Sequence, residues 1–401
     1  MTQREFKLRA VLGALMCLPI ANLRIQGQND LQAWAIGPFV RPADEPVIKP
    51  DPDAVFDCPL SKEPVHWEKA WVYNPAAVVR DGKIVVLFRA QQGPGNTCSR
   101  IGYAESDDGI HFKTDPAPVF YPADDAQQSM EWSGSERVGG CEDPRITESP
   151  DGLYVLTYTQ YHGKVPRLGI ASTKDLRAWT KYGSPFNGSK YQDNHGVQLK
   201  SASIVNEVKD GHVVAARING KFWMYFGETC VNLAISDDLI HWVPLEGKDG
   251  KPLVVMSPRR GLPDSSLDEI GPEPLLTDKG IVVFYNGKNA DPKKNGDPAL
   301  SGGVYTGMEA LFDANDPAKL IARLDHPYIK PELPFEKTGL YKAGTTFTEG
   351  LVLFKGKWFV YYGCADSFVG VAICDPAQRN KGVFADRERT TRPGKKSTEQ
   401  K

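Results

Sequence analysis

The sequence predicts an all-β protein, and more specifically a five-bladed β-propeller, from three observations. The chain of 401 residues contains 38 glycines and 31 prolines, and 10% of its residues are aromatic. This composition suits many short strands joined by tight turns. A pattern of a turn followed by a strand recurs five times. The copies follow one another at a long and nearly regular spacing, which is typical of propellers and other repeat architectures.

Each copy of the repeat is a turn containing glycine, followed by β-branched and aromatic residues that end in Phe or Tyr. The glycine permits the positive φ of a hairpin turn, and the run after it is a strand signal. The copies cover residues 81–88, 151–158, 219–226, 279–285 and 355–362. Their glycines are 70, 68, 60 and 76 residues apart, which is room for four strands and their loops. Two β-sandwiches in tandem are the alternative, but they would need a linker with a composition shift near the middle, and none occurs.

The repeats therefore predict one propeller domain over residues 30–377, with different segments at its two ends. Residues 1–9 are basic and residues 10–21 carry no charge, which is the pattern of a secretory signal peptide over residues 1–21. We expect export to the periplasm or the medium. A buried N-terminal helix or a misassigned start is the alternative, and it would make the protein cytoplasmic. Residues 378–401 are polar and are expected to form a disordered tail.

Composition and motifs exclude several function classes. The 48 Lys and Arg nearly balance the 50 Asp and Glu, for a net charge of −2, so no nucleic-acid partner is expected. The uncharged N-terminal stretch is too short for a bilayer, which needs roughly 20 apolar residues, so no membrane insertion is expected. No phosphate-binding loop, dinucleotide fingerprint or serine-hydrolase elbow occurs, and the seven histidines and seven cysteines lack metal-site spacing. We therefore predict no cofactor and no metal, and leave disulfide pairing and oligomeric state open.

The starts of the predicted blades carry polar residues where apolar ones would be usual. Inner strands of a propeller converge on its axis, so these residues are expected to face a shared central cavity. The segments are 73–75, 142–145, 200–203, 271–274 and 347–350, and four of the five contain charged groups. Any single one of them could equally be an ion pair or a turn cap. A cavity lined by carboxylates, bases and aromatic rings suits a carbohydrate.

Several of these segments resemble one known family. The motif at residues 139–146, the pairs Asn74-Pro75 and Phe88-Arg89, and the segment 361–366 closely resemble glycoside hydrolase family 130. Members of that family are five-bladed propellers that act on β-mannosides, and the resemblance spans essentially the folded chain. It implies a manno-oligosaccharide or mannose-containing glycan as the substrate.

The resemblance also implies roles for particular residues. Asp143 corresponds to the catalytic acid, which in the family is thought to work through a hydroxyl of the substrate as a proton relay. Asn74, Arg89 and Asp366 correspond to residues that hold the mannose at the site of cleavage. Arg145, from the same motif as Asp143, is also assigned to substrate binding.

The family contains phosphorylases and hydrolases, which need different residues. A phosphorylase must bind phosphate with Arg, Lys or His, whereas a hydrolase needs a carboxylate that activates water. The third hairpin of the phosphorylases ends in His-Arg-Pro, but here it ends at Glu228, and Glu273 in the fourth blade start is a second acid. This pattern resembles the branch of the family that hydrolyses β-1,2-mannosides.

We therefore expect an exo-acting, inverting hydrolase in which Asp143 is the acid and Glu228, Glu273 or both activate water. Inverting pairs of carboxyl groups lie roughly 6.5–9.5 Å apart. Lys200 either contacts the substrate or retains an anion site, which keeps a β-mannoside phosphorylase producing mannose 1-phosphate as the alternative. A non-catalytic glycan-binding propeller is the second alternative.

The linkage, β-1,2 or β-1,4, and the length of the substrate depend on loops such as 119–135 and 257–267, and the sequence leaves both open. Three aromatic residues in the first loop, Phe120, Tyr121 and Trp132, could stack a second sugar. We expect them rather to pack the loop onto its own blade.

Overall fold

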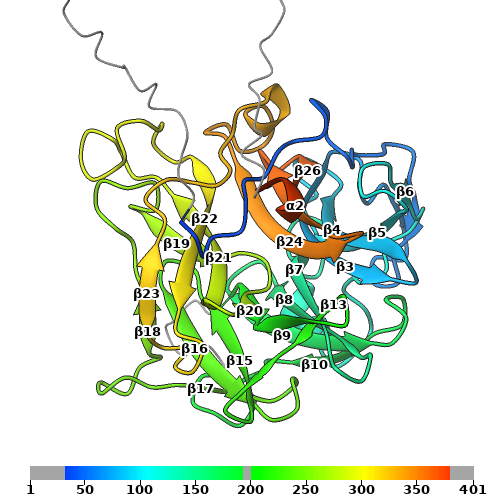
Figure 1. Ribbon diagram of the computed structural model, residues 1–401. Coiled ribbons are helices and arrows are strands. Elements are labelled where there is room, and N and C mark those ends of the chain that lie inside the picture. The colour runs from blue at the N-terminus through cyan, green and yellow to red at the C-terminus, as the bar shows by residue number, and fades with distance from the viewer. Residues whose placement is uncertain (1–31, 193–199, 380–401) are drawn as a thin grey trace, which may run out of the picture. The chain divides into compact units, whose positions relative to one another are not determined.

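The computed structural model describes residues 32–192 and 200–379, and almost all of its regular structure is β-strand (Figure 1). Helical segments in this part of the chain are short: α1 (Gln128–Glu131), a 3₁₀ turn (Pro334–Glu336) and α2 (Pro376–Arg379). No helix in the described ranges is long and apolar enough to cross a membrane. The predicted signal peptide and residues 380–401 of the predicted tail lie outside the described residues.

The first two repeats each form a four-stranded antiparallel sheet in which the strand order follows the sequence. The first sheet consists of β3 (Trp71–Arg80), β4 (Lys83–Gln91), β5 (Arg100–Ser106) and β6 (Lys113–Thr114). The second consists of β7 (Gly140–Glu148), β8 (Tyr154–Tyr161), β9 (Pro166–Thr173) and β10 (Thr180–Gly183). The predicted glycine turns join the first two strands of both sheets, as expected.

The third and fourth repeats form larger sheets, and one hairpin that follows a strand of the third sheet belongs to the fourth. The third sheet contains β11 (Ala202–Ile204), β14 (Arg217–Ile218), β15 (Lys221–Phe226), β16 (Val231–Ser236), β17 (Trp242–Pro244) and β18 (Val254–Met256). The fourth contains β12 (Asn206–Lys209), β13 (His212–Ala215), β19 (Leu267–Ile270), β20 (Leu275–Thr277), β21 (Gly280–Lys288), β22 (Tyr305–Phe312) and β23 (Leu320–Arg323). Because β12 pairs in parallel with β20, the hairpin that follows β11 belongs to the neighbouring sheet.

The fifth repeat forms a sheet of three strands, β24 (Thr346–Phe354), β25 (Lys357–Cys364) and β26 (Phe368–Cys374). The segment before the first repeat lies along the free edge of β26 through two isolated bridges, Val40 with Ile373 and Ile48 with Val369. A separate two-stranded sheet pairs β1 (Phe56–Asp57) with β2 (Pro64–Val65).

The all-β class and the propeller arrangement are confirmed, but the prediction of a five-bladed propeller is wrong, because the structure has four full blades. Four sheets have the four or more strands of a full blade, whereas the fifth has three. The backbone of the N-terminal segment pairs with the last sheet through these two isolated bridges and forms no fourth strand there. The repeat pattern does not predict the number of strands in each sheet, because it covers only one strand of the sheet and the turn before that strand.

Hydrophobic clusters between neighbouring sheets form the core. One cluster joins Leu87 and Tyr103 of the first sheet to Leu156 and Tyr158 of the second. The inner strands β3, β7 and β24 also pack against one another. Nonpolar faces buried between sheets are the main favourable term in such a fold.

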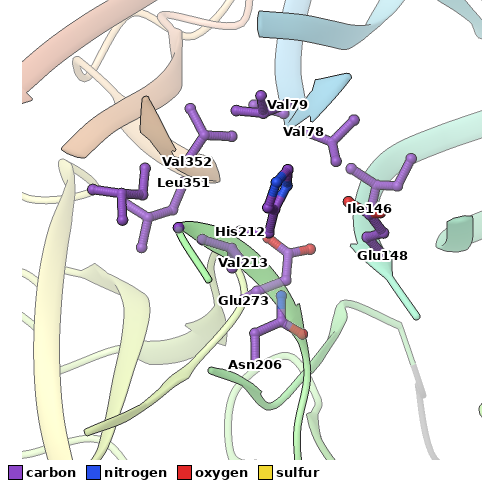
Figure 2. Close-up of a pocket in the computed structure, with 13 residues that line it drawn as sticks. Val78, Val79, Ile146, Glu148, Asn206, His212, Val213, Glu273, Leu351 and Val352 are labelled. Carbon is purple, nitrogen blue, oxygen red and sulfur yellow. The ribbon is translucent and has the colours of Figure 1, made fainter. Parts of the chain in front are cut away.

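The predicted central cavity is not found. Val78, Ile146 and Val352 project from the inner strands toward the same space, with His212 and Glu273 beside them (Figure 2). The space that remains measures about 20 Å³, which is room for about one water molecule. Apolar side chains on the inner strands therefore close the ring at this level. Three residues of the polar blade starts, Asn74, Asp143 and Lys200, line a different depression.

Gly140 is a position where the fold requires glycine. Its φ is +116°, and a Cβ atom there would collide with the backbone of Ser99. We expect Gly140→Ala to lower the free energy of unfolding by about 3 kcal/mol, since overpacking and a forced positive φ both contribute. Gly82→Ala is the matched control, because Gly82 also has a positive φ but open space around it. Urea denaturation of the two variants checks this prediction, and equal losses of stability would contradict it.

Candidate active site

Backbone irregularities at the inner strands aim two polar side chains into one place. The β3–β4 ladder shifts at Asn74, whose φ is 50°, and the β7–β8 ladder shifts between Glu142 and Arg145, where Asp143 has a φ of 48°. Positive φ is uncommon outside glycine but is tolerated best by Asn and Asp. Bulges often re-aim a side chain next to a functional site. The two strands thus bring Asn74 and Asp143 into contact.

Asp143 lies at the centre of a hydrogen-bonded group. Its Oδ1 accepts hydrogen bonds from Asn74 Nδ2 at 2.7 Å and from Arg89 Nη1 at 2.8 Å. Arg89 also donates to Glu142 Oε1 at 2.7 Å and to Ser99 Oγ at 3.0 Å. The guanidinium group therefore fixes two neighbouring carboxylates, as its planar fork of donors allows.

The surroundings of Asp143 favour its charged form. Burial alone would raise the pKa of Asp143, but the charges of Arg89 and Lys200 and the hydrogen bond from Asn74 outweigh burial. The pKa of Asp143 is therefore held below its ordinary value. Without substrate, this residue is a carboxylate at neutral pH.

Lys200 connects three carboxylates. Its Nζ lies 3.8 Å from Asp143 Oδ2, 3.7 Å from Glu228 Oε1 and 3.2 Å from Glu269 Oε1. Burial would lower the pKa of Lys200, but these carboxylates raise it above its ordinary value. Lys200 is therefore a charged group shared among the acids.

Glu228 lies across Lys200 from Asp143. The two distances to Lys200 Nζ place Glu228 Oε1 and Asp143 Oδ2 at most about 7.5 Å apart, a bound that overlaps the roughly 6.5–9.5 Å spacing of inverting pairs. Burial raises the pKa of Glu228, Lys200 opposes that effect, and Glu269 and Asp143 add to it. A carboxylate whose pKa is raised in this way is a better acceptor for a proton from water.

Glu269 is a site residue that the sequence reasoning missed. It lies on β19, is 2% exposed, and accepts a hydrogen bond from Ser201 Oγ at 2.5 Å in addition to its contact with Lys200. The sequence pattern indicates a loop at residues 257–267 and no strand after it, whereas the structure has β19 there. The sequence offered only one signal for Glu269, which is an acid directly after that loop.

The structure does not bring Glu273 together with Asp143 and Glu228. Glu273 is 2% exposed and lines the small enclosed space in Figure 2, away from the depression that holds the other acids. Burial raises the pKa of Glu273 to about 8. Its position gives it no direct contact with a sugar bound next to Asp143.

Arg145 is also placed behind the site. It donates to the backbone carbonyl oxygens of Asp143 at 3.1 Å, of Ile270 at 2.6 Å and of Gly271 at 3.1 Å, and it pairs with Glu349 at 2.9 Å. Its side chain is 1% exposed. Arg145 therefore supports the backbone of Asp143 and of the segment after Glu269, and it does not line the depression.

The other predicted residues line one open depression of about 400 Å³. It contains Asn74, Arg89, Asp143, Lys200, Glu228 and Asp366, all named from the sequence, together with Glu269. Aromatic side chains of Tyr73, Tyr305, Tyr341 and Phe347 complete its wall. Aromatic rings beside carboxylates and bases are the combination that a sugar needs.

Within the described residues, no group of three or more His, Cys, Asp or Glu side chains is arranged to hold a metal ion. The six described cysteines are free thiols. Of the aromatic residues in loop 119–135, Phe120 packs edge-on against Tyr158 and Trp179, so its expected packing role is confirmed.

An all-β propeller that gathers paired acids, bases and aromatic rings in one depression has the form of a glycoside-active enzyme. The chain belongs to glycoside hydrolase family 130: the family described as β-1,4-mannooligosaccharide phosphorylase matches residues 41–378. The resemblance seen in its motifs is thereby confirmed.

Relatives of known name or structure fall into two groups. The 1,2-β-oligomannan phosphorylase of Thermoanaerobacter sp. (strain X514) is 31% identical over 344 residues, covering 84% of this chain and 96% of that protein. A solved glycosyl hydrolase structure from Bacteroides ovatus is 48% identical, with a TM-score of 0.83, over 87% of this chain and 97% of that one. Another solved structure, described with glycoside hydrolases of the family that target β-1,2-mannosidic linkages in Candida mannan, is 48% identical, with a TM-score of 0.82, over 86% and 96%.

Proposed function

We propose that this protein is an exo-acting, inverting glycoside hydrolase that releases mannose from β-1,2-linked manno-oligosaccharides. The observation that carries the proposal is the position of Glu228. Its carboxylate shares Lys200 with Asp143, and both acids line the same depression. The β-1,2 linkage is supported by the similar structure described with hydrolases of that specificity.

The reaction requires one proton to leave water and one to reach the leaving oxygen. In the proposed mechanism Glu228, with Glu269 beside it, accepts the proton of the attacking water. Asp143 supplies the other proton, directly or through a sugar hydroxyl. Because Asp143 is a carboxylate in the free protein, it must gain a proton when the substrate binds. A bound sugar that displaces water and separates Asp143 from Lys200 would raise the pKa of Asp143 and so favour that gain.

Phosphorolysis is the second candidate, and the named relatives favour it, since the Thermoanaerobacter protein is a phosphorylase. The charges in the depression favour hydrolysis. Its lining includes two cations, Arg89 and Lys200, and four carboxyl groups, Asp143, Glu228, Glu269 and Asp366. Both cations already pair with carboxylates among the described residues. A phosphate dianion would have to compete with these partners for its charge-assisted hydrogen bonds.

The linkage is tested by supplying β-1,2-mannobiose and β-1,4-mannobiose in parallel and measuring released mannose. We expect the β-1,2 compound to be cleaved at least tenfold faster, which corresponds to about 1.4 kcal/mol of differential transition-state binding. A preference for the β-1,4 compound would contradict the proposed specificity.

The sugar-binding role of Asp366 predicts a pH dependence of KM. Burial raises the pKa of Asp366 to about 6, although Arg89 opposes this. Below pH 6 the carboxyl group gains a proton and loses an acceptor for a sugar hydroxyl, so KM is expected to rise as pH falls through 6. Asp366→Asn should have a high KM that no longer changes in this range. A KM that stays constant from pH 7 to pH 5 in the unsubstituted protein would contradict the role.

We further propose that the protein is exported, on the basis of the basic and uncharged segments in residues 1–21. Fractionation of cells that produce the full chain tests this. Processing near residue 21 and recovery outside the cytoplasm are expected, and an intact chain in the cytoplasm would contradict export.

A further inference from the structure

A second hollow lies away from the candidate active site. The outer hollow, as we call it, is bounded by the loop between β6 and α1 and by the segment from β9 to β10. Its volume of about 390 Å³ matches the 400 Å³ of the depression around Asp143, and no residue lines both. It is lined by Val119, Phe120, Tyr121, Ala123, Asp125, Ala126, Gln127, Arg177, Trp179 and Lys181.

Aromatic rings form one side of the outer hollow. Phe120 is 2% exposed and meets Trp179 edge-on at 5.3 Å between ring centres. Tyr121 packs against Phe56 at 4.7 Å. Phe120 thus anchors the wall, while Tyr121 and Trp179 remain partly exposed. Partly exposed rings held in place by packing are suited to contact the apolar face of a sugar.

The polar groups of the outer hollow are balanced in charge. Lys181 pairs with Glu131 at 2.5 Å and with Asp125 at 3.3 Å. Arg177 pairs with Asp115 and lies over the ring of Tyr103. Because each cation already has a carboxylate partner, the hollow has little attraction for an anion. It presents donors and acceptors together, which suits a neutral polyhydroxyl ligand.

Gln127 adds an amide to this wall. Its Oε1 accepts a hydrogen bond from Gln160 Nε2 at 3.2 Å, which fixes the orientation of the amide. Gln127 lines the hollow, and its Nε2 donates no hydrogen bond within the described part of the chain. An oriented amide of this kind can donate to a sugar hydroxyl.

We propose that the outer hollow is a second carbohydrate-binding site, which holds a neutral sugar unit of the glycan at a distance from the point of cleavage. The identity of that glycan as a manno-oligosaccharide rests on the proposed function. The existence of the site rests on the hollow itself. Trp179 and Tyr121 supply the stacking surface, and Gln127 and Asp125 supply the hydrogen bonds.

The test is calorimetric titration of the full-length Asp143→Asn protein with a β-1,2-manno-oligosaccharide of several units. Adding Trp179→Ala is expected to remove one binding site per chain. The milder Gln127→Ala is expected to weaken the same site about tenfold, roughly the loss of one hydrogen bond. Melting temperatures show whether the variants fold. If both variants fold and bind with unchanged stoichiometry and affinity, the inference is overturned.

Turnover separates this inference from the proposed function. With Asp143 intact, Trp179→Ala should hydrolyse β-1,2-mannobiose at the unsubstituted rate, because Trp179 does not line the depression. A protein that binds the oligosaccharide through Trp179 but never hydrolyses it would support the second site and contradict the proposed function. Hydrolysis together with binding that does not depend on Trp179 or Gln127 would support the proposed function and contradict the second site.

Discussion

Replacing Asp143 with asparagine is expected to lower kcat on β-1,2-mannobiose by about a thousandfold, within the range that general acid catalysis contributes. The amide is nearly the same size as the carboxyl group, but it cannot deliver a proton to the leaving oxygen. The contacts of Asn74 and Arg89 with Asp143 make some loss of binding geometry expected as well. Initial rates of mannose release at saturating substrate measure the effect.

Asp278→Asn is the control for Asp143→Asn. Asp278 is an exposed residue whose carboxylate pairs with Lys279 at the surface, so its substitution is expected to leave kcat unchanged. Melting temperatures of both variants separate loss of chemistry from loss of fold. An Asp143→Asn protein that folds and keeps more than a tenth of the activity would remove Asp143 from the role of acid.

Glu228→Gln and Glu273→Gln are expected to differ by at least a hundredfold in kcat. Glu228 lines the depression and contacts Lys200, so loss of its carboxylate removes the proposed base. Glu273 does not line the depression, and its variant should keep activity within a few-fold of the unsubstituted protein. Glu269→Gln is expected to behave like Glu228→Gln, because Glu269 shares Lys200 with it. Equal losses from Glu228→Gln and Glu273→Gln would contradict this assignment.

Glu273 should instead influence stability. Burial raises its pKa in the folded protein to about 8, so between pH 4.5 and 8 the folded state holds a proton that the unfolded state releases. Stability from this group therefore falls as pH rises toward 8. Glu273→Gln is expected to flatten that part of the pH dependence of the free energy of unfolding, which urea titrations at pH 5 and pH 8 measure.

The fold was predictable where a local pattern determined it. Glycine turns such as Gly82 and Gly152 begin the second strand of their sheets, because few other residues adopt the required φ. The hairpin formed by β12 and β13 was not predictable as part of the fourth sheet. Its parallel pairing with β20 depends on a distant segment, and nothing local to residues 206–215 specifies that partner.

Sequence motifs identified Asp143 and Arg89 as site residues. They could not show which neighbouring side chains face the depression, because that depends on the direction of each side chain. Asp143 and Arg145 are two apart, and in a regular strand they would share a face. The register shift between Glu142 and Arg145 breaks that alternation, so Asp143 lines the depression and Arg145 lies behind it. Similarly, Glu269 and Glu273 are near neighbours in sequence, and only the path of the chain between β19 and β20 shows that Glu269 faces Lys200.

In the proposed reaction water, and not phosphate, attacks the glycosidic bond. Its most direct test is incubation of the purified protein with β-1,2-mannobiose, with and without excess inorganic phosphate, while NMR follows the anomeric protons. We predict that α-mannose appears first, because the reaction inverts the β configuration, and at the same rate in both samples. Mannose 1-phosphate formed only in the sample with phosphate would show phosphorolysis and contradict the role given to Glu228.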